Sequence, residues 1–225
     1  MLDGVFIENY AAPPVDEREI LRYAGNKADA DESLKKLLDE CLRECLPVLS
    51  YRVCYAVGKA RELEETFGGE YKGTLLTRRL CGAEYAAAFA ATVGLGIDRL
   101  ILRYTEVAPT KALLLQAIGA ERIEALCDAF CKDMQTEWAT KGFKVGARFS
   151  AGYGDFPLTA QRKIFALLSP ERRIGLTLNG SLLMTPTKSV TAIVPIGGNA
   201  TLSGGCAECE LKECEMRGGV RGQGT

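Results

Sequence analysis

The sequence predicts an α+β fold, a single domain in which a mainly antiparallel, twisted sheet is packed by long helices. Hydrophobic residues make up 47% and charged residues 25% of the 225 residues, which supplies a sizeable core. Long stretches repeat their apolar residues at helical spacing, and shorter stretches alternate or are wholly apolar, as strands are. From Gly197 the composition shifts to glycine and small polar residues. We therefore expect one domain over residues 1–197 and a glycine-rich tail with three cysteines over residues 198–225.

The first part of the chain is expected to form a strand and two helices. The strand is short, Val5–Ile7, and the first helix starts at Asp16, where acids favour the first turn. A second helix runs from about Asp31 to Leu46. Its apolar stripe consists of Leu34, Leu37, Leu38, Cys41, Leu42 and Cys45. Two thiols four residues apart could hold a metal, but we interpret Cys41 and Cys45 as small buried hydrophobes.

The next part of the chain contains three expected strands. Ser50–Val57 alternates and is rich in tyrosine and valine, and Leu75–Thr77 is a further, shorter candidate. Glu84–Gly96 is ambiguous, because its alanines favour a helix while the apolar run Phe89–Gly94 suits a buried strand. We interpret it as a strand.

The pattern from Ile97 to Trp138 is helical, with a break near Pro109 and a stop signal at Lys141-Gly142. This region contains the longest element of the chain. Two further cysteines within it, Cys127 and Cys131, are interpreted as core residues.

The last part of the domain alternates short strands and a helix. Phe143–Phe149 is expected as a strand, and a helix follows Pro157 and Thr159. Ile174–Leu178 and Ser189–Val194 are strand candidates. The inward side chains of the helix are expected to be Ile164, Phe165, Leu167 and Leu168.

Composition excludes several classes of function. The net charge of −1 gives no bulk attraction to nucleic acid or to an anionic membrane. We see no secretory signal, and the most apolar window, Tyr85–Gly96, is too short to span a bilayer. A cytoplasmic protein is therefore expected, whose nine cysteines are thiols or metal ligands. The absence of histidine excludes Ser-His-Asp and Cys-His nucleophiles and histidine-containing metal sites.

One loop, Arg148–Pro157, combines residue types that suit a small charged ligand. Arg148 offers a planar fork for a carboxylate, and two glycines allow a ligand to approach the main chain. Tyr153 and Phe156 offer flat faces for a ring or a cation. The alternative is a polar turn in which Arg148 is simply solvated.

Two motifs together give a family resemblance. The loop carries Arg-x-x-x-Gly-Tyr from Arg148 to Tyr153 after a long acidic helix, and Met-Thr-Pro-Thr-Lys-Ser-Val-Thr follows at Met184–Thr191. Together they resemble the reactivation domain of cobalamin-dependent methionine synthase, most clearly over residues 90–195. The sequence Gly-Tyr-Gly-Asp-Phe-Pro-Leu and the three tail cysteines are closer to the stand-alone form of the domain, which is encoded separately from the rest of the synthase.

The resemblance implies a site for S-adenosylmethionine. Arg148 would bind the ligand's carboxylate, the following main chain would line the ligand, and Tyr153 would lie beside it. Glu124, which aligns with a glutamate on the family's long helix, could accept from the ligand's amino group, or it is a solvated helix carboxylate. The implied binding residues are Glu124, Arg148, Phe149, Ser150, Ala151, Gly152 and Tyr153.

The resemblance also implies a function without a catalytic residue in this chain. The cobalamin would be carried by a partner, either a cobalamin-binding methionine synthase subunit or another corrinoid protein. A flavodoxin-like or ferredoxin-like donor would reduce the partner's cob(II)alamin. S-adenosylmethionine would then methylate it. This chain would contribute proximity, which is worth roughly 7–11 kcal/mol at best.

The sequence departs from the family's pattern in three places. Gly154 follows Gly-Tyr where the synthase has a proline, and residues 193–205 lack the second tyrosine of the fused enzymes. The family's N-terminal acidic contact to the ligand has no counterpart that we can place.

The tail gives an independent hypothesis. Cys206-Ala-Glu-Cys209 followed by Cys214 suits zinc or an iron–sulfur cluster, with Cys81 or Cys54 as a possible fourth ligand. The alternative is a tail with redox-sensitive thiols.

Two functions other than reactivation therefore remain: an electron-transfer accessory protein that acts through these cysteines, and a stand-alone methyltransferase. The latter ranks last, because the glycine-rich loop after a parallel strand is missing.

Overall fold

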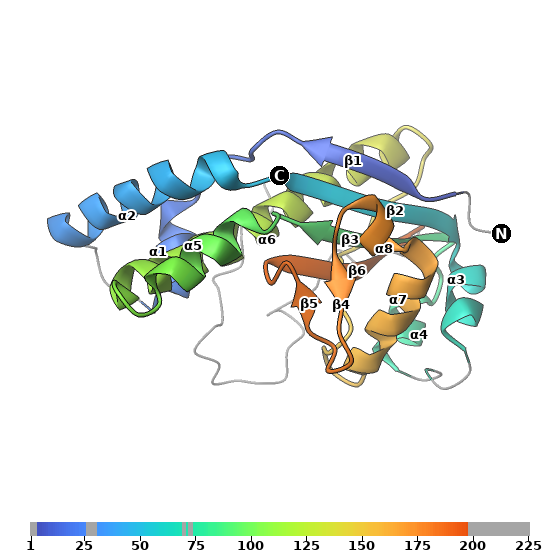
Figure 1. Cartoon of the computed structure of the whole chain (residues 1–225). Helices are drawn as coiled ribbons and strands as arrows, with labels where there is room; N and C mark the ends of the chain where they lie inside the picture. The colour runs from blue at the N-terminus through green and yellow to red at the C-terminus, as the bar shows by residue number, and fades with distance from the viewer. Residues whose placement is uncertain (1–3, 26–30, 69–70, 72–73, 198–225) are drawn as a thin grey trace.

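The computed structural model of the chain describes residues 4–25, 31–68, 71 and 74–197. Its centre is a four-stranded antiparallel sheet with the order β1-β2-β3-β6 (Figure 1). These strands are β1 (Phe6–Tyr10), β2 (Tyr51–Lys59), β3 (Tyr85–Thr92) and β6 (Ser189–Ile196). The predicted α+β class with a mainly antiparallel sheet is confirmed.

Helices cover both faces of this sheet. One face carries α6 (Pro109–Ala139), and α1 (Glu17–Tyr23), α2 (Glu32–Cys45) and α5 (Gly96–Tyr104) pack against α6 beyond the end of the sheet (Figure 1). The other face carries α3 (Ala60–Phe67), α4 (Leu75–Leu80) and α7 (Gln161–Leu168). The remaining short elements are η1 (Leu46–Val48), η3 (Leu158–Ala160), α8 (Pro170–Arg173), β4 (Thr177–Leu178) and β5 (Met184–Thr185). None of the helices in these described ranges has both the length and the apolar character needed to cross a membrane.

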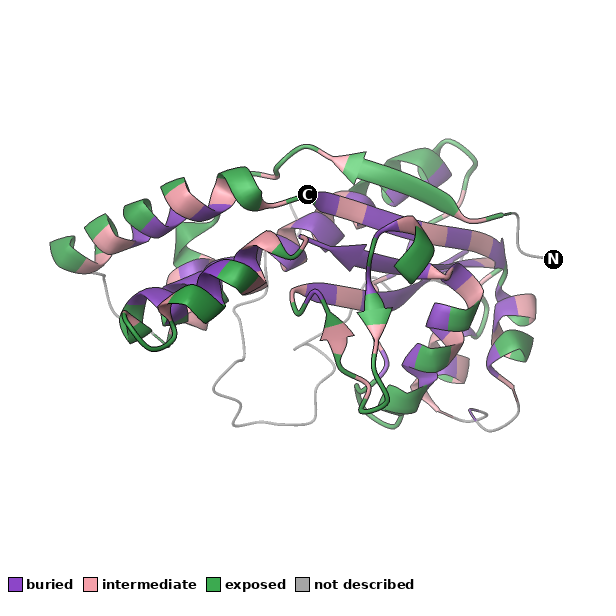
Figure 2. Cartoon of the chain, viewed as in Figure 1, coloured by how far each residue is buried: buried purple, intermediate pink, exposed green. Residues whose placement is uncertain are grey.

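The strand β3 lies in the middle of the molecule, and it is buried on both faces (Figure 2). Ala86, Ala88 and Ala90 face the α3–α4–α7 side, and Ala87 and Ala91 face α6. Small side chains let both helical layers approach the sheet closely. This confirms the interpretation of the ambiguous alanine-rich run as a strand, since tertiary burial outweighs the helical preference of alanine.

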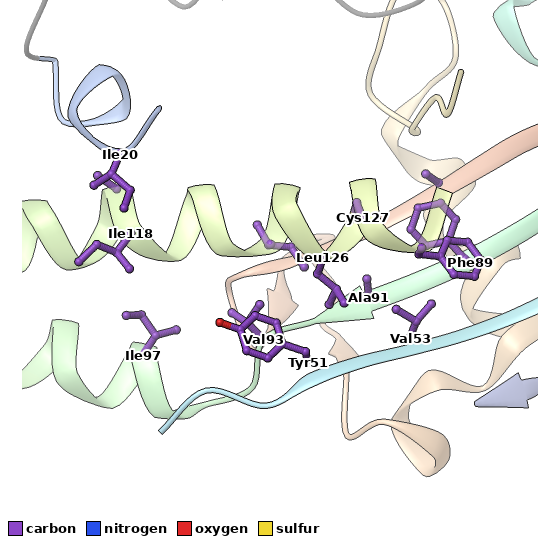
Figure 3. Close-up of a cluster of buried hydrophobic side chains, with 14 of the residues drawn as sticks. Ile20, Tyr51, Val53, Phe89, Ala91, Val93, Ile97, Ile118, Leu126 and Cys127 are labelled. Carbon is purple, nitrogen blue, oxygen red and sulfur yellow. The ribbon is translucent and has the colours of Figure 1, made fainter. Parts of the chain in front are cut away.

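The helix α6 provides the main packing surface on its face of the sheet. Its side chain Leu126 lies toward Tyr51, Ala91 and Val93 at the sheet, whereas Ile118 lies between Ile20 of α1 and Ile97 of α5 (Figure 3). The predicted break at Pro109 is confirmed, because this proline is the first residue of α6. Cys41, Cys45 and Cys127 are buried, as expected of small hydrophobes, and Cys131 is partly buried.

A buried ion pair fastens the N-terminal segment to α6. Arg122, 0% exposed, donates to the Pro13 and Pro14 carbonyl oxygens at 2.6 Å each and to both carboxylate oxygens of Glu121. Glu121 in turn accepts from the main-chain N–H of Asp16, the N-cap residue of α1. These bonds satisfy a charge that would otherwise be costly to bury.

Three predictions of local structure were wrong. Leu75–Thr77 starts the helix α4 instead of forming a strand, because its first turn is capped from a distant segment. Most of Ile174–Leu178 is not a strand, since only Thr177–Leu178 pairs, with Met184–Thr185. In addition, the helix α3 was not predicted from the sequence.

The third wrong prediction concerns Phe143–Phe149, which runs along β6 without forming a regular strand. Isolated bridges join Val145 to Ile196 and Phe149 to Ile193. The step from Val145 to Phe149 is one residue longer than the step from Ile196 to Ile193, so an extra residue interrupts the ladder. Such an irregularity redirects side chains at a sheet edge.

Candidate functional site

The predicted loop begins at the edge of the sheet beside β6. The main chain of Phe149 exchanges two hydrogen bonds with that of Ile193, at 3.0 and 2.8 Å. The side chain of Phe149 packs in the core on the α7 side of the sheet. Its neighbour Arg148 points the other way, toward α6, because successive side chains alternate along extended chain.

Arg148 is held by two carboxylates of α6. Its Nη2 donates to Glu124 Oε2 at 2.5 Å, and its Nη1 donates to Asp128 Oδ1 at 2.6 Å. Glu124 and Asp128 are four residues apart and therefore share one face of the helix. The side chains of Arg148, Glu124 and Asp128 are 22%, 37% and 42% exposed. The structure thus excludes the alternative in which Arg148 is simply solvated.

We call Glu124, Asp128 and Arg148 the Arg148 cluster. One guanidinium and two carboxylates give it a formal charge of −1. Burial of the guanidinium by itself lowers the pKa of Arg148, but the carboxylates of Glu124 and Asp128 raise it above the usual value. The guanidinium of Arg148 therefore stays protonated and positively charged. The guanidinium has five N–H hydrogens, of which these two bonds use one each.

Two thiols lie beside the cluster on α6. Burial raises the pKa of both Cys127 and Cys131 above the ordinary value for a thiol, although the charge of Arg148 opposes this shift. Cys127 is fully buried, whereas Cys131 is partly exposed. Both therefore stay protonated and add no charge to the cluster.

The rest of the loop is a tight turn built on two glycines. Gly152 and Gly154 have φ angles of 95° and 56°, in the left-handed region that favours glycine. The Gly152 N–H donates to the Phe156 carbonyl oxygen at 2.8 Å, and the Phe156 N–H donates to the Tyr153 carbonyl oxygen at 3.1 Å. The glycines are therefore required by the fold of the loop itself.

The two aromatic residues of the loop have different positions. Phe156 is 0% exposed and packs against Phe67, Tyr71 and Phe149, with ring centroids 5.9–6.0 Å apart. The expectation that Phe156 offers a face to a ligand was wrong, since α3 and its neighbours cover it. Tyr153 is 66% exposed.

The acid of the loop anchors it to α4. Asp155 Oδ1 accepts from the main-chain N–H of Leu75 at 2.7 Å, and its carboxylate pairs with Arg78 at 3.0 Å. Side-chain bonds from Arg78, together with the Leu75 N–H, lower the pKa of Asp155. Asp155 is thus a positioning residue of the loop.

The second motif, Met184–Thr191, leads into β6. Asp98 of α5 accepts hydrogen bonds from the main-chain N–H of Thr187, at 3.0 Å, and from its hydroxyl. The Ser189 hydroxyl bonds to the Pro186 carbonyl oxygen at 2.8 Å and to Thr92 at 2.9 Å. The serine of this motif therefore has a structural role at the start of the strand.

No site for a metal ion is found among the described residues, where no three metal-ligating side chains are grouped. The proposed ligands Cys206, Cys209 and Cys214 lie outside the described ranges. Of the two candidate fourth ligands, Cys54 is 0% exposed, and burial raises its pKa to about 11, while Cys81 is exposed.

Two surface hollows lie away from the Arg148 cluster and from its loop. One, of about 480 Å³, is lined by α2 and η1. The other, of about 570 Å³, lies between the first two strands and the end of α6 and is lined by aromatic and charged side chains.

Residues 77–201, more than half of the chain, match the family described as the activation domain of vitamin B12 dependent methionine synthase. The chain belongs to this family. The matched region of this activation domain contains α6, the whole Arg148–Pro157 loop and β6, and thus every residue of the Arg148 cluster.

A solved structure gives the same fold for nearly the whole activation domain. It is a crystal structure of the MetH reactivation domain bound to AdoHcy, with a TM-score of 0.57 and 16% sequence identity. The similarity covers 85% of this chain and 78% of that chain, so it extends beyond the family match into the N-terminal elements. No curated protein matches the chain.

The structure brings the predicted residues Arg148 and Glu124 into direct contact, with Tyr153 exposed on the same loop. The sequence analysis missed Asp128, although its spacing of four residues from Glu124 on a predicted helix was a usable signal. It also missed the anchoring role of Asp155, which no local pattern indicates.

Proposed function

We propose that this activation domain binds S-adenosylmethionine at the Arg148 cluster and presents its methyl group to a cobalamin carried by a partner. The partner would be a cobalamin-binding methionine synthase subunit or another corrinoid protein. The observation that carries the proposal is the contact of Arg148 with Glu124 and Asp128, on a loop that also exposes Tyr153. The family and the AdoHcy complex of a protein with the same fold support it.

The charges of the cluster suit the amino-acid end of the ligand. The ligand's carboxylate would accept hydrogen bonds from Arg148, and its ammonium group would donate a hydrogen bond to Glu124. Tyr153 would offer its ring to the sulfonium, since cations favour the faces of aromatic rings. No proton has to be removed in this scheme, which agrees with the absence of histidine.

The main chain after Arg148 can contribute only in part. Both main-chain polar groups of Phe149 are used by Ile193, and the Gly152 N–H is used by Phe156. The side chains of Phe149 and Ala151 are buried. Of the predicted lining residues, Ser150 and Ala151 therefore have the main-chain groups best placed for a ligand, while Phe149 and Gly152 shape the loop.

The proposed reaction transfers a methyl group. One electron from a flavodoxin-like or ferredoxin-like donor reduces the partner's cob(II)alamin to cob(I)alamin. The new cobalt–carbon bond takes its electron pair from that reduced cobalt, the sulfur–carbon bond breaks, and S-adenosylhomocysteine leaves. This chain holds the methyl group in place, an effect of proximity. The side chains of the cluster are 22–42% exposed, and the partner would approach the ligand from this exposed side.

The test combines this chain with a corrinoid partner that carries cob(II)alamin, a reductant and S-adenosylmethionine. We expect methylcobalamin, followed by its absorption spectrum, to form only when the chain is present. Methylcobalamin formation at an equal rate without the chain would exclude the proposed function.

A further inference from the structure

The hollow between β1, β2 and the end of α6 is a second candidate binding site. Its volume of about 570 Å³ is in the range of small-molecule sites. We call it the Trp138 hollow, because Trp138 at the end of α6 lines it together with Tyr85 of β3. Trp138 follows Asp128 by ten residues on α6, so the hollow lies about 15 Å along the helix axis from the Arg148 cluster.

The floor of the Trp138 hollow is largely apolar and aromatic. Tyr55, Val57 and Lys59 line it from β2, where every second side chain shares one face of the strand. Phe6 of β1 lies opposite Tyr55 in the ladder, and the centroids of the two rings are 5.4 Å apart. Phe6 is 49% exposed, on a strand that faces solvent along most of its length (Figure 2). The hollow therefore offers exposed ring surface to a flat ligand.

The ammonium groups of two lysines cover the other two rings of the hollow. Nζ of Lys59 lies 3.8 Å from the centroid of the Tyr85 ring, and Nζ of Lys141 lies 4.5 Å from the centroid of the Trp138 ring. A cationic ligand binds to aromatic rings on such faces. Because two positive groups already occupy them, the Trp138 hollow disfavours a cationic ligand.

One of these two ammonium groups is available to an anion. Lys141 pairs with Glu137 at 2.5 Å. Glu62, the other carboxylate of the hollow, has an interaction of its own. Lys59, at the exposed end of β2, forms no ion pair within the part of the chain that the structure describes. Its ammonium group can therefore donate hydrogen bonds to a carboxylate or a phosphate.

We propose that the Trp138 hollow binds a planar aromatic molecule that carries a carboxylate or a phosphate. The ring of this ligand packs against Phe6 and Tyr55, and its anionic group pairs with Lys59. The inference goes beyond the proposed function and does not depend on it, because no residue of the Arg148 cluster lines the hollow.

The test uses the fluorescence of Trp138, which is the single tryptophan of the chain and so reports on the hollow without a label. The full chain is titrated with 4-nitrobenzoate and with 4-nitrophenyl phosphate, whose nitroaromatic rings quench tryptophan. 4-Nitrobenzylamine, a cation at neutral pH, is the matched control ligand. We expect saturable quenching by both anions and an affinity for the cation that is at least about tenfold weaker. The stronger of the two anions shows which acidic group the natural ligand carries.

Three variants, each checked for folding by circular dichroism, locate the bound ligand. Lys59→Met keeps the length of the side chain and removes its charge, and it is expected to weaken binding of both anions about tenfold. Phe6→Ala removes the exposed ring and is expected to weaken binding about three- to tenfold. The control Lys36→Met removes a lysine of α2 that is 75% exposed and should leave binding unchanged.

Two kinds of result would overturn the inference. One is quenching that rises without saturation or that is equally strong for the anions and the cation. The other is an unchanged affinity for the anions in both Lys59→Met and Phe6→Ala. Neither result affects the proposed function, which is tested with S-adenosylmethionine, and failure of that ligand to bind leaves the inference about the Trp138 hollow intact.

Discussion

The Asp155 carboxylate accepts a hydrogen bond, 2.7 Å long, from the main-chain N–H of Leu75, which is 80 residues away in the sequence. This bond ties the loop that carries Arg148 and Tyr153 to the first turn of α4. The carboxylate also pairs with Arg78, at 3.0 Å. The position of Tyr153 therefore depends on α4, which lies on the face of the sheet opposite to α6.

Asp155→Asn is expected to lower the thermal stability of the domain in a pH-dependent manner. Arg78 and the Leu75 N–H lower the pKa of Asp155, so the folded state favours the carboxylate. The stabilisation is complete above the pKa of an unfolded aspartate, about 3.9, and disappears as the pH falls through the lower folded-state value. Melting temperatures of both proteins from neutral to acidic pH check this. A difference that stays constant over that range would show that the carboxylate charge does not matter.

Arg122→Ala is expected to destabilise the domain by about 3–5 kcal/mol, because it leaves the buried Glu121 without its partner. It also removes the bonds to the Pro13 and Pro14 carbonyl oxygens. Urea unfolding gives the free energy. Arg61→Ala, which breaks an exposed ion pair with Glu65, is the matched control and should cost at most about 1 kcal/mol. Similar losses in the two variants would contradict the assigned role of Arg122.

Cys131 is expected to report occupancy of the site. It is partly exposed beside Arg148, so a bound ligand would cover it. We expect S-adenosylmethionine to slow its alkylation by iodoacetamide several-fold, as measured by peptide mass spectrometry. Exposed Cys81 serves as the internal control, and its rate should not change. Equal alkylation of Cys131 with and without the ligand would place the ligand elsewhere.

Removal of metal ions is expected to leave S-adenosylmethionine binding unchanged, because the Arg148 cluster requires none. Dialysis against a chelator under anaerobic conditions, followed by metal and sulfide analysis and by titration, checks this. The same analysis tests the hypothesis of zinc or an iron–sulfur cluster at Cys206, Cys209 and Cys214. Loss of binding together with loss of metal would show that the tail takes part in the site.

The sequence predicted the elements whose signals are local. The long helix with its start at Pro109 follows from apolar spacing, and β3 follows from a short apolar run between turns. The sequence did not predict α4, whose first turn depends on the distant Asp155. Nor did it predict that one extra residue beside β6 would interrupt the expected strand before Arg148.

The candidate site was predictable to the extent that residue chemistry decides it. Arg148 and Glu124 were assigned to the two charged ends of one ligand on the basis of the family resemblance, and the structure places the two side chains in contact with each other. Phe156 was misassigned because its burial depends on Phe67, a side chain of a helix that the pattern did not reveal. Asp128 was missed although it lies four residues from Glu124 on the predicted helix; that it pairs with Arg148, from a distant segment, is seen only in the structure.

The most direct test of the account is calorimetric titration of S-adenosylmethionine into the wild type, Arg148→Ala and the control Arg61→Ala, each checked for folding. We predict that the wild type and Arg61→Ala bind equally well. Arg148→Ala should bind about 10- to 100-fold more weakly, the effect of losing a charged hydrogen bond. Equal affinities for Arg148→Ala and the wild type, or no binding by the wild type, would contradict the central claim that the Arg148 cluster holds this ligand.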